Sequence, residues 1–380
     1  MSYVRIFIGS IVLFFCSCSN QHPTVPDNVY GPTIEIRKEQ LVYGSSSDVL
    51  ELKSYSTTAY WEQDSCKRII AYNHFRHSLD FIDLTGEKVV TSVDLQREGP
   101  HGVVGKVCSI CPVSEDSIWI YDGIKMYLLN NKGQINAELE FDKKEAVIIR
   151  TNFAMNTAKF RYNKDHNSFL YLRSRDKQWL IEEYGIMQRK VINSYPLEHS
   201  IYNPNGDKKY ANMEAPNVNF SPLGIVYNYP YESTVYVLDT LSGNTRKYGG
   251  KSGYTLECAS ELETTVDYSK WEQHGITNPH YYDVMYLSEL KLYVRPHLGE
   301  TSLESGKSIR ELGDGRQLYL MFFDEKFNVI GEFPMAKNTY SYFTGWCALP
   351  ESLLLFVDNS LNENTNYENL IIELFCPLKS

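Results

Sequence analysis

A pattern of short apolar runs separated by polar turns recurs along the chain, and it is clearest between residues 69 and 95. There the apolar triplet Ile70-Ala71-Tyr72 ends in Asn73, a polar turn follows, and a second apolar run covers residues 79–84. Runs this short, rich in β-branched and aromatic residues and bounded by Gly, Asn and Asp, are typical of strands joined by hairpin turns. The pattern therefore predicts consecutive antiparallel hairpins.

The same cassette occurs six times, and each time an apolar triplet ends in a polar residue. A strand-like piece and a tight turn precede each triplet, and most copies add a fourth strand after the second apolar run. Four strands per copy, with a copy roughly every 45 to 55 residues, indicate a β-propeller. The six polar ends are Asn73, Asp122, Arg173, Asn228, Arg295 and Asp358.

The sixth copy has no room for a fourth strand after Phe375, whereas residues 34–41 form an isolated strand-like segment before the first copy. Pairing this segment with the last blade would close the ring and leave no open edge. We therefore predict an all-β fold, a six-bladed β-propeller whose N-terminal strand closes the last blade. The alternatives are a sandwich of unrelated hairpins and a ring with seven blades or an irregular number.

The N-terminus has the features of a targeting signal. Arg5 is followed by an apolar run, residues 6–15, that is too short to span a bilayer, and small residues come next. Residues 1–17 are therefore predicted to be a signal peptide. The stretch Phe15-Cys16-Ser17-Cys18 resembles the bacterial lipobox, in which a small residue precedes an invariant cysteine. The resemblance implies that Cys18 is acylated, and the alternative is a plain secretory signal.

Residues 18–33 are polar and contain three prolines, so they are predicted to be a flexible tether. Residues 34–380 are predicted to form a single propeller domain with an insertion around 249–282. An insertion of this length is usually a lid over the ring or a flap packed on its side. Within it, residues 257–271 are predicted to form a short helix, with Leu262 and Val266 on one face.

The formal net charge is −10 and no long basic block occurs, so nucleic acid is set aside as a partner. Cys108 and Cys111 form a Cys-x-x-Cys in the predicted first strand of the second copy. Residues three apart in a strand point to opposite faces, which is wrong for a metal site or a redox pair. We therefore expect buried thiols there, with no metal and no cofactor.

The predicted topology places the candidate binding residues at one face of the propeller. If the triplets are second strands, their polar ends lie where the loops between blades also emerge. One such loop, residues 97–102, adds Arg97, Glu98 and His101. Together with the six polar ends, these residues are the candidate ligand-binding set. The alternative is that each polar end only caps its own hairpin, although Arg173 and Arg295 are the least easily explained in that way.

The chain resembles a family of six-bladed, propeller-like lipoproteins of Bacteroidota whose members carry a domain of unknown function. The resemblance covers residues 34–375 and rests on the lipobox and tether, on the repeated cassettes and on two short motifs. Arg97-Glu98-Gly99-Pro100 resembles the Gly-Glu-Gly-Pro turn of that family, and Tyr293-Val294-Arg295 resembles its Tyr-x-Arg strand end. The resemblance implies the fold and a location in the cell envelope, but no chemistry.

Three classes of function follow. The one we favour is a non-catalytic binding module for a glycan, a peptide or an envelope protein, because 29 tyrosines and five tryptophans offer flat amphipathic surfaces. The second is a polysaccharide hydrolase or lyase that uses carboxylates such as Glu98 and Asp122. The third is a structural component of an outer-membrane complex. No acidic run follows Cys18, which favours an outer-membrane lipoprotein on the periplasmic side over one exported to the surface.

Overall fold

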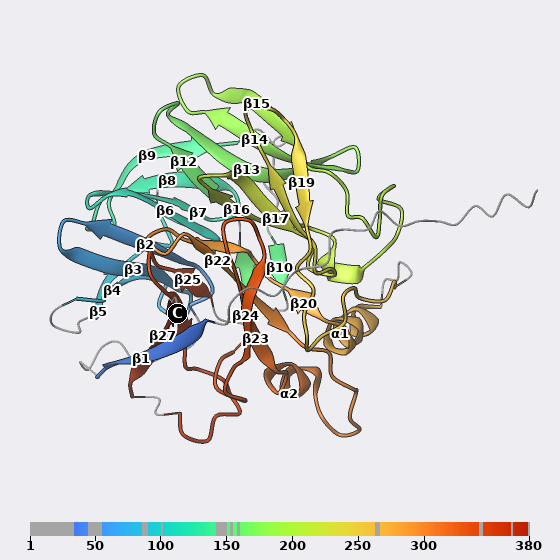
Figure 1. Cartoon of the computed structure of the whole chain (residues 1–380). Helices are drawn as coiled ribbons and strands as arrows, with labels where there is room; N and C mark the ends of the chain where they lie inside the picture. Colours follow the sequence, from blue (N-terminus) through green and yellow to red (C-terminus); the bar gives the residue numbers. More distant parts are fainter. Residues whose placement is uncertain are drawn as a thin grey trace, which may run out of the picture.

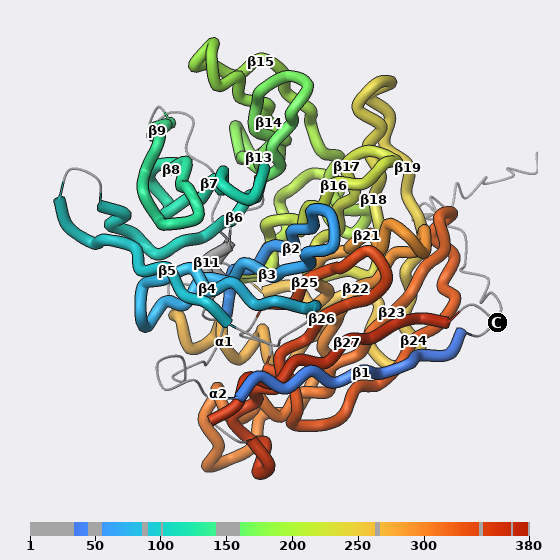
Figure 2. Tube along the Cα trace, turned by 90° about the vertical axis from the view of Figure 1, so that its left-hand side faces the viewer, coloured from blue at the N-terminus to red at the C-terminus, as the bar shows by residue number. Residues whose placement is uncertain are grey.

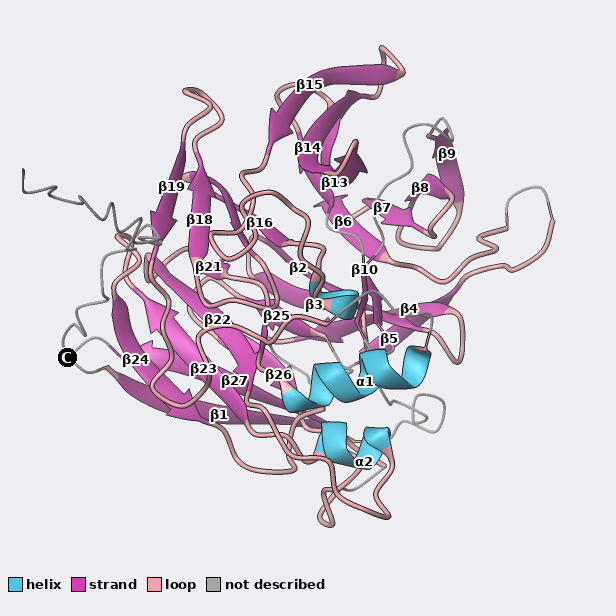
Figure 3. Cartoon of the chain, turned by 90° about the vertical axis from the view of Figure 1, so that its right-hand side faces the viewer, coloured by secondary structure: helices cyan, strands magenta, loops and turns pink. Residues whose placement is uncertain are grey.

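The computed structural model describes residues 34–44, 55–85, 90–99, 102–141, 150–152, 155–157, 160–262, 267–341, 345–365 and 368–378. Six antiparallel sheets surround a common centre and form a six-bladed β-propeller (Figures 1 and 3). A separate two-stranded sheet consists of β10 (Arg150–Asn152) and β11 (Met155–Thr157).

The predicted triplets are second strands and the predicted second apolar runs are third strands, as the cassette suggested. Blade 1 contains β2 (Thr58–Gln63), β3 (Cys66–Asn73), β4 (Ser78–Asp83) and β5 (Val90–Asp94). Blade 2 contains β6 (Ser109–Ser114), β7 (Ser117–Tyr121), β8 (Lys125–Leu129) and β9 (Ile135–Glu140). Blade 3 contains β12 (Phe160–Asn163), β13 (Ser168–Arg175), β14 (Gln178–Gly185) and β15 (Lys190–Pro196).

Blade 4 contains β16 (Asn217–Ser221), β17 (Gly224–Asn228), β18 (Val235–Leu238) and β19 (Thr245–Tyr248). In blade 5 the first strand is split into β20 (His280–Tyr281) and β21 (Met285–Leu287), which both pair with β22. The rest of blade 5 is β22 (Leu292–Leu298), β23 (Leu318–Phe323) and β24 (Val329–Pro334). Blade 6 contains β25 (Trp346–Ala348), β26 (Leu353–Phe356), β27 (Leu370–Leu378) and β1 (Glu35–Tyr43).

The N-terminal strand closes the ring as predicted. Strand β1 pairs antiparallel with β27 along its whole length, from Glu35 opposite Leu378 to Tyr43 opposite Leu370 (Figure 2). The last blade is thus built from both ends of the propeller, and its third strand gains a partner instead of an open edge.

A hydrophobic cluster fills each of the six interfaces between neighbouring blades. Successive side chains of one strand pack into different clusters, on opposite faces of the blade. Leu353 and Leu355 of β26 pack toward blade 5, whereas Leu354 and Phe356 pack toward blade 1. Because both faces of each sheet are covered, second strands such as β7, β17 and β26 contain continuous apolar runs without alternating polar positions.

The two faces of the propeller differ in their connections. Tight hairpins join first to second and third to fourth strands, and we call their side the turn face. Connections from second to third strands, and from one blade to the next, emerge on the opposite side, which we call the loop face. The loop face carries the long segments of the chain, so it is the elaborated side of the scaffold.

Three long loop-face segments form what we call the cap, residues 197–216, 249–279 and 299–317. They contain η2 (Ala211–Met213), α1 (Tyr268–Thr277) and α2 (Ile309–Asp314). Helix α1 contacts both other helices, and Figure 3 shows α1 beside α2. None of the described helices is long and apolar enough to cross a membrane.

One buried arginine fastens two of the three cap segments together. Arg316 donates to the backbone oxygens of Gly299 at 2.8 Å, Gly275 at 2.7 Å and Asn278 at 2.6 Å. The last two oxygens lie at the C-terminal end of α1, where a cation is favoured by the helix dipole. The insertion therefore lies on the loop face, held to the loop that joins β22 to β23.

The predicted helix at residues 257–271 was misplaced. Helix α1 begins at Tyr268, where Asp267 caps it by accepting a hydrogen bond from the backbone of Ser269 at 3.1 Å. Leu262 instead forms a parallel bridge with Tyr210 of the preceding cap segment. Pairing with another part of the chain thus overrides the thin apolar stripe on which the prediction rested. Val266 lies outside the described residues.

Candidate functional site

Four of the six polar ends lie at or just beyond the loop-face ends of their second strands, as the topology predicted, and two lie within the strand. Asn73 and Asn228 are the last residues of β3 and β17, and Asp122 directly follows β7. Asp358 follows β26 closely, whereas Arg173 and Arg295 lie inside β13 and β22. Their contacts show what each side chain does there.

Asn73 and Asp122 cap their own hairpins and also hold neighbouring groups. The side-chain oxygen of Asn73 accepts from the backbone of Arg76 at 3.2 Å. The Asp122 carboxylate accepts from the backbone of Ile124 and Lys125 at 2.9 Å each. It also accepts from the backbone of Gly105 and the hydroxyl of Tyr127, both at 3.2 Å. With four donors around it, this carboxylate has little capacity left for acid–base work.

Arg173 and Asp358 also have internal partners. Arg173 donates to Glu182 at 3.0 Å, and the other oxygen of that buried carboxylate accepts from Arg175 at 2.8 Å. Asp358 accepts a hydrogen bond from the backbone of Ser341 at 3.3 Å. These contacts lie within blade 3 and beside blade 6, apart from the remaining candidates.

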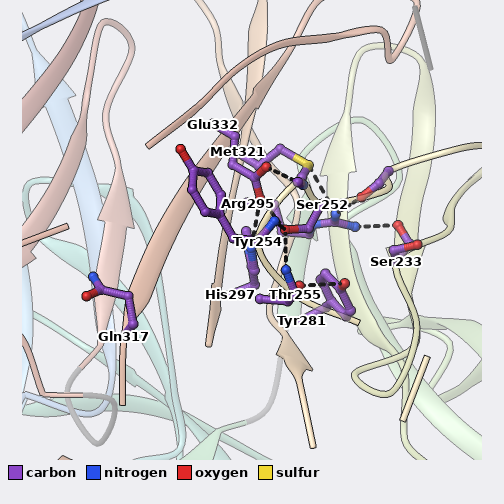
Figure 4. A network of polar contacts seen from close by, with 12 residues as sticks. Ser233, Ser252, Tyr254, Thr255, Tyr281, Arg295, His297, Gln317, Met321 and Glu332 are labelled. Atoms are coloured by element: carbon purple, nitrogen blue, oxygen red, sulfur yellow. Dashed lines mark hydrogen bonds and ion pairs between the residues drawn. The ribbon is translucent and has the colours of Figure 1, made fainter. Parts of the chain in front are cut away.

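Arg295 is fully buried at the junction of blades 4 and 5 (Figure 4). Its guanidinium donates to the backbone oxygens of Ser233 and Gly250, both at 2.6 Å. The cation also lies 4.6 Å from the ring centre of Tyr281 and 5.3 Å from that of Phe323. Burial lowers the pKa of Arg295 to about 10, so the group stays charged at neutral pH. Its direct partners are these two carbonyls, the sulfur of Met321 at 3.2 Å and the two aromatic faces, all of which favour a buried cation.

Asn228 belongs to the same junction. Its amide donates to the backbone oxygen of Tyr281 at 3.4 Å, and Asn217 of the adjacent strand donates to the same oxygen at 2.8 Å. Asn228 and Arg295 are therefore brought together around Tyr281, one on its carbonyl and the other on its ring.

Sequence reasoning missed two titratable groups beside Arg295, namely His297 and Glu332 (Figure 4). Their side chains lie 3.0 Å apart, from Nε2 of His297 to a carboxylate oxygen of Glu332. Glu332 also accepts from the hydroxyl of Ser252 at 2.5 Å and the backbone of Gly253 at 2.8 Å. A usable clue was available, because residues two apart in a strand share a face, and His297 follows Arg295 at that spacing.

Opposing effects set the charge of this pair. Burial raises the pKa of Glu332, but the close contact with His297 and the hydrogen bonds from Ser252 and Gly253 outweigh it and hold the pKa below its ordinary value. Burial lowers the pKa of His297 despite the nearby Glu332. The pair is thus a carboxylate beside a neutral imidazole, and it anchors the start of the insertion to blade 5.

The loop at residues 97–102 is exposed at Arg97 and Glu98, whereas His101 lies outside the described residues. Gly99 has φ +95°, a backbone conformation that favours glycine. A Cβ at Gly102 would lie 3.0 Å from the backbone of Arg97 and Glu98, so the turn also needs glycine there.

A buried histidine fixes the following part of that loop. Nε2 of His77 donates to the backbone oxygen of Val103 at 2.7 Å, and Nδ1 of the same ring accepts from the hydroxyl of Tyr72 at 2.8 Å. Burial lowers the pKa of His77, which keeps the ring neutral. Asn73, Arg97, Glu98 and Asp122 therefore belong to one loop cluster on blades 1 and 2.

Tyrosine hydroxyls are hydrogen-bonded to buried carboxyl groups in five blades. These tyrosine rings and hydroxyls stabilise the scaffold. The high tyrosine count is therefore weaker evidence for a ligand-binding surface than the sequence analysis assumed. The pairs are Tyr55–Asp80 at 2.7 Å, Tyr127–Asp122 at 3.2 Å, Tyr171–Glu182 at 3.4 Å, Tyr236–Glu232 at 2.8 Å and Tyr340–Glu373.

Cys108 and Cys111 are free thiols in one hydrophobic cluster between blades 2 and 3. The prediction that they point to opposite faces was wrong. Cys108 lies just before β6, so the alternation of side chains along that strand does not apply to it. Burial raises the pKa of each thiol to about 11. Within the described part of the chain, no three His, Cys, Asp or Glu side chains gather in a way that could hold a metal ion.

Comparison with known proteins identifies the family. The model of a domain of unknown function, DUF4221, matches residues 33–334. The crystal structure of a DUF4221 member from Bacteroides vulgatus superposes with a TM-score of 0.71 at 15% identity, over 92% of this chain and 99% of that one. No curated protein matches the sequence.

Two other structures are more distant. A luciferin-regenerating enzyme superposes with a TM-score of 0.46 at 10% identity, over 89% of this chain and 95% of its own. Hydrazine synthase from Kuenenia stuttgartiensis superposes with a TM-score of 0.44 at 12% identity, over 83% of this chain and 77% of its own. The family match spans most of the blades, and this chain therefore belongs to the DUF4221 family.

Proposed function

We propose that this protein is a non-catalytic binding module of the bacterial cell envelope that holds its partner on the loop face. The observation that carries the proposal is the contrast between the two faces. Tight hairpins make up the turn face, whereas the loop face carries the cap and the exposed loops of blades 1 and 2. Binding residues concentrate on loops that a rigid scaffold holds in place.

The carboxylates favour binding over catalysis. A polysaccharide-cleaving site needs two carboxyl groups, one to donate a proton and one to act as base or nucleophile. Asp122 is enclosed by four donors from its own and the neighbouring loop. Glu98 lies exposed on a glycine-containing turn. The two carboxyl groups thus lie in different settings, one enclosed by donors and the other in solvent.

The position of β1 supports the loop face as the partner-binding side. The strand begins at Glu35, opposite Leu378, which is the turn-face end of β27. A lipid on Cys18 and a tether over residues 18–33 would therefore join the domain at the turn face. A tether of that length reaches at most about 55 Å when extended. The loop face would then point away from the membrane, toward a partner in the periplasm.

The anchor is tested in cells by metabolic labelling with a clickable fatty acid. We expect label on the wild type and on Cys16→Ser, and none on Cys18→Ser. Label that persists in Cys18→Ser would contradict the anchor. This pair of variants separates the two cysteines of the lipobox-like stretch.

Binding is tested by thermal shift on the mature chain carrying Cys18→Ser, against glycans, peptides, and calcium or chelator. A ligand present at a hundred times its Kd stabilises the folded state by about 2.7 kcal/mol. We expect a shift with at least one organic ligand class and no turnover of that ligand. Turnover that Asp122→Asn abolishes would overturn the proposal in favour of the enzyme.

A further inference from the structure

We propose that an apolar patch formed by Phe75, Val104 and Ile124 on the loop face binds a protein segment that presents apolar side chains together with carboxylates. This inference rests on the proposed function and names the surface and the class of partner. We call these three residues the blade 1–2 patch.

The three side chains are exposed on three successive loops. Phe75 is 57% exposed and lies between β3 and β4, Val104 is 70% exposed and lies between β5 and β6, and Ile124 is 58% exposed and lies between β7 and β8. Each of these connections emerges on the loop face. Large apolar groups gathered on neighbouring loops mark an interaction site more often than single exposed ones do.

The patch is held rigidly by the buried groups beneath it. His77, two residues after Phe75, donates to the carbonyl of Val103, which directly precedes Val104. Gly105, which follows Val104, donates to Asp122 at 3.2 Å, and the same carboxylate accepts from the backbone of Ile124 at 2.9 Å. The three loops are thus hydrogen-bonded in series. A surface ordered before binding loses less conformational entropy when the partner arrives.

The charge beside the patch differs from that of the whole chain. The chain has 37 basic and 47 acidic residues. The patch is flanked by the exposed cations Arg97 and Lys106, and neither forms an ion pair with another described residue. Basic groups without internal partners favour a partner that carries carboxylates, through steering and complementarity.

A protein explains the patch better than a lipid surface does. Glu98 is exposed on the same loop as Arg97, whereas Asp94 at the start of that loop lies 4.0 Å from the guanidinium of Arg76 and forms an ion pair with it. An anionic bilayer would repel the Glu98 carboxylate, whereas a protein can present a mixed set of charges. The aliphatic side chains of Val104 and Ile124 also suit the apolar residues of a protein more than the stacking of sugar rings.

The test is selection of a phage-displayed random peptide library on the mature chain carrying Cys18→Ser. Affinities of the enriched peptides are then compared across variants. The loop variant is Phe75→Ser/Val104→Ser/Ile124→Ser. The matched control, Met187→Ser/Leu223→Ser/Leu241→Ser, removes side chains that are 80%, 46% and 97% exposed on the turn face. Each variant is first checked for an unchanged Tm, which is expected because all six side chains are exposed.

We expect enriched peptides that share apolar residues and Asp or Glu. The loop variant should weaken their binding about tenfold or more, the control less than about twofold, and Arg97→Glu/Lys106→Glu about tenfold with loss of the salt dependence. Peptides without acidic residues, or binding that survives in the loop variant, would overturn the inference. A selection that enriches no peptide would also overturn the inference, whether or not the protein binds phosphatidylglycerol vesicles.

Two outcomes separate this inference from the proposed function. Peptides that bind the loop variant normally but lose affinity in Tyr254→Ala, a cap residue that is 53% exposed, would move the site to the cap and leave the proposed function standing. Peptides that lose affinity only in the turn-face control would overturn both the blade 1–2 patch and the proposed loop-face binding function.

Discussion

Arg295 of blade 5 donates a hydrogen bond of 2.6 Å to the backbone oxygen of Ser233, which belongs to the connection between the second and third strands of blade 4. The same guanidinium donates to Gly250 at the start of the insertion. One buried cation therefore joins two blades and the insertion, and its role in the fold can be separated from any role in binding.

Replacing Arg295 should destabilise the fold. In Arg295→Met two buried carbonyls lose their donor, and each such loss costs about 1–3 kcal/mol. We expect the free energy of unfolding in urea to fall by roughly 2–6 kcal/mol, while Arg97→Met, at an exposed position, changes it by less than about 0.5 kcal/mol. A variant as stable as the wild type that no longer binds peptide would instead make Arg295 a ligand residue, as predicted from the sequence.

Glu232 should make stability fall as the pH rises. Burial raises the pKa of this carboxyl from 4.5 to about 8, so the folded state holds its proton more tightly than the unfolded state does. Its contribution to the free energy of unfolding is then greatest below about pH 4.5 and is lost as the pH rises from about 4.5 to about 8. Glu232→Gln, which cannot ionise, should remove this fall.

The measurement for Glu232 is urea unfolding at several pH values between 5 and 8. The stability of Glu232→Gln relative to the wild type should rise steadily over this range, by about 1.4 kcal/mol for each pH unit. Glu98→Gln is the exposed control and should leave the pH dependence unchanged. Parallel curves for wild type and Glu232→Gln would show that this carboxyl is not protonated in the fold.

Acid should release the start of the insertion. The pKa of Glu332 lies below its ordinary value, because its hydrogen bonds outweigh the effect of burial, so the stability it adds is present above about pH 4.5 and is lost as the pH falls through the lowered value. Glu332→Gln should weaken the same anchor at neutral pH. We expect hydrogen exchange at the Gly253 amide to accelerate about tenfold or more, with Glu300→Gln as the exposed control. Unchanged exchange would mean that Arg295 alone holds the segment.

Cys108 and Cys111 should resist alkylation in the native protein. Thiolate is the reactive form, and a pKa of about 11 leaves roughly one thiol in a thousand ionised at pH 8. Mass spectrometry after brief iodoacetamide treatment should find the partly exposed Cys66 and Cys376 modified first. Rapid modification of Cys108 or Cys111, or a disulfide between them, would restore the redox reading that the sequence analysis set aside.

The fold was predictable because its information is local and repeated. Each blade carries its own triplet, turns and second apolar run, so a few clear copies such as residues 69–95 identify the rest. Ring closure followed from a missing strand at one end and a spare strand at the other.

The surroundings of Arg295 were not predictable in this way. The anchor between Ser252 and Glu332 joins residues 80 positions apart, and no local pattern encodes such a contact. The blade 1–2 patch did have a local clue, because Phe75 and Ile124 are apolar residues inside predicted polar turns. Apolar residues in polar turns are expected to be exposed, so the sequence alone could have indicated a binding surface there.

Site-specific photo-crosslinking in the native host tests most directly whether the loop face is the partner-binding face. A benzophenone amino acid is placed at Val104, and in a second strain at Leu241 on the turn face, both of which are well exposed. We predict a discrete covalent protein adduct from position 104 and none from position 241. An adduct from position 241 only, or lipid as the sole product at position 104, would contradict it.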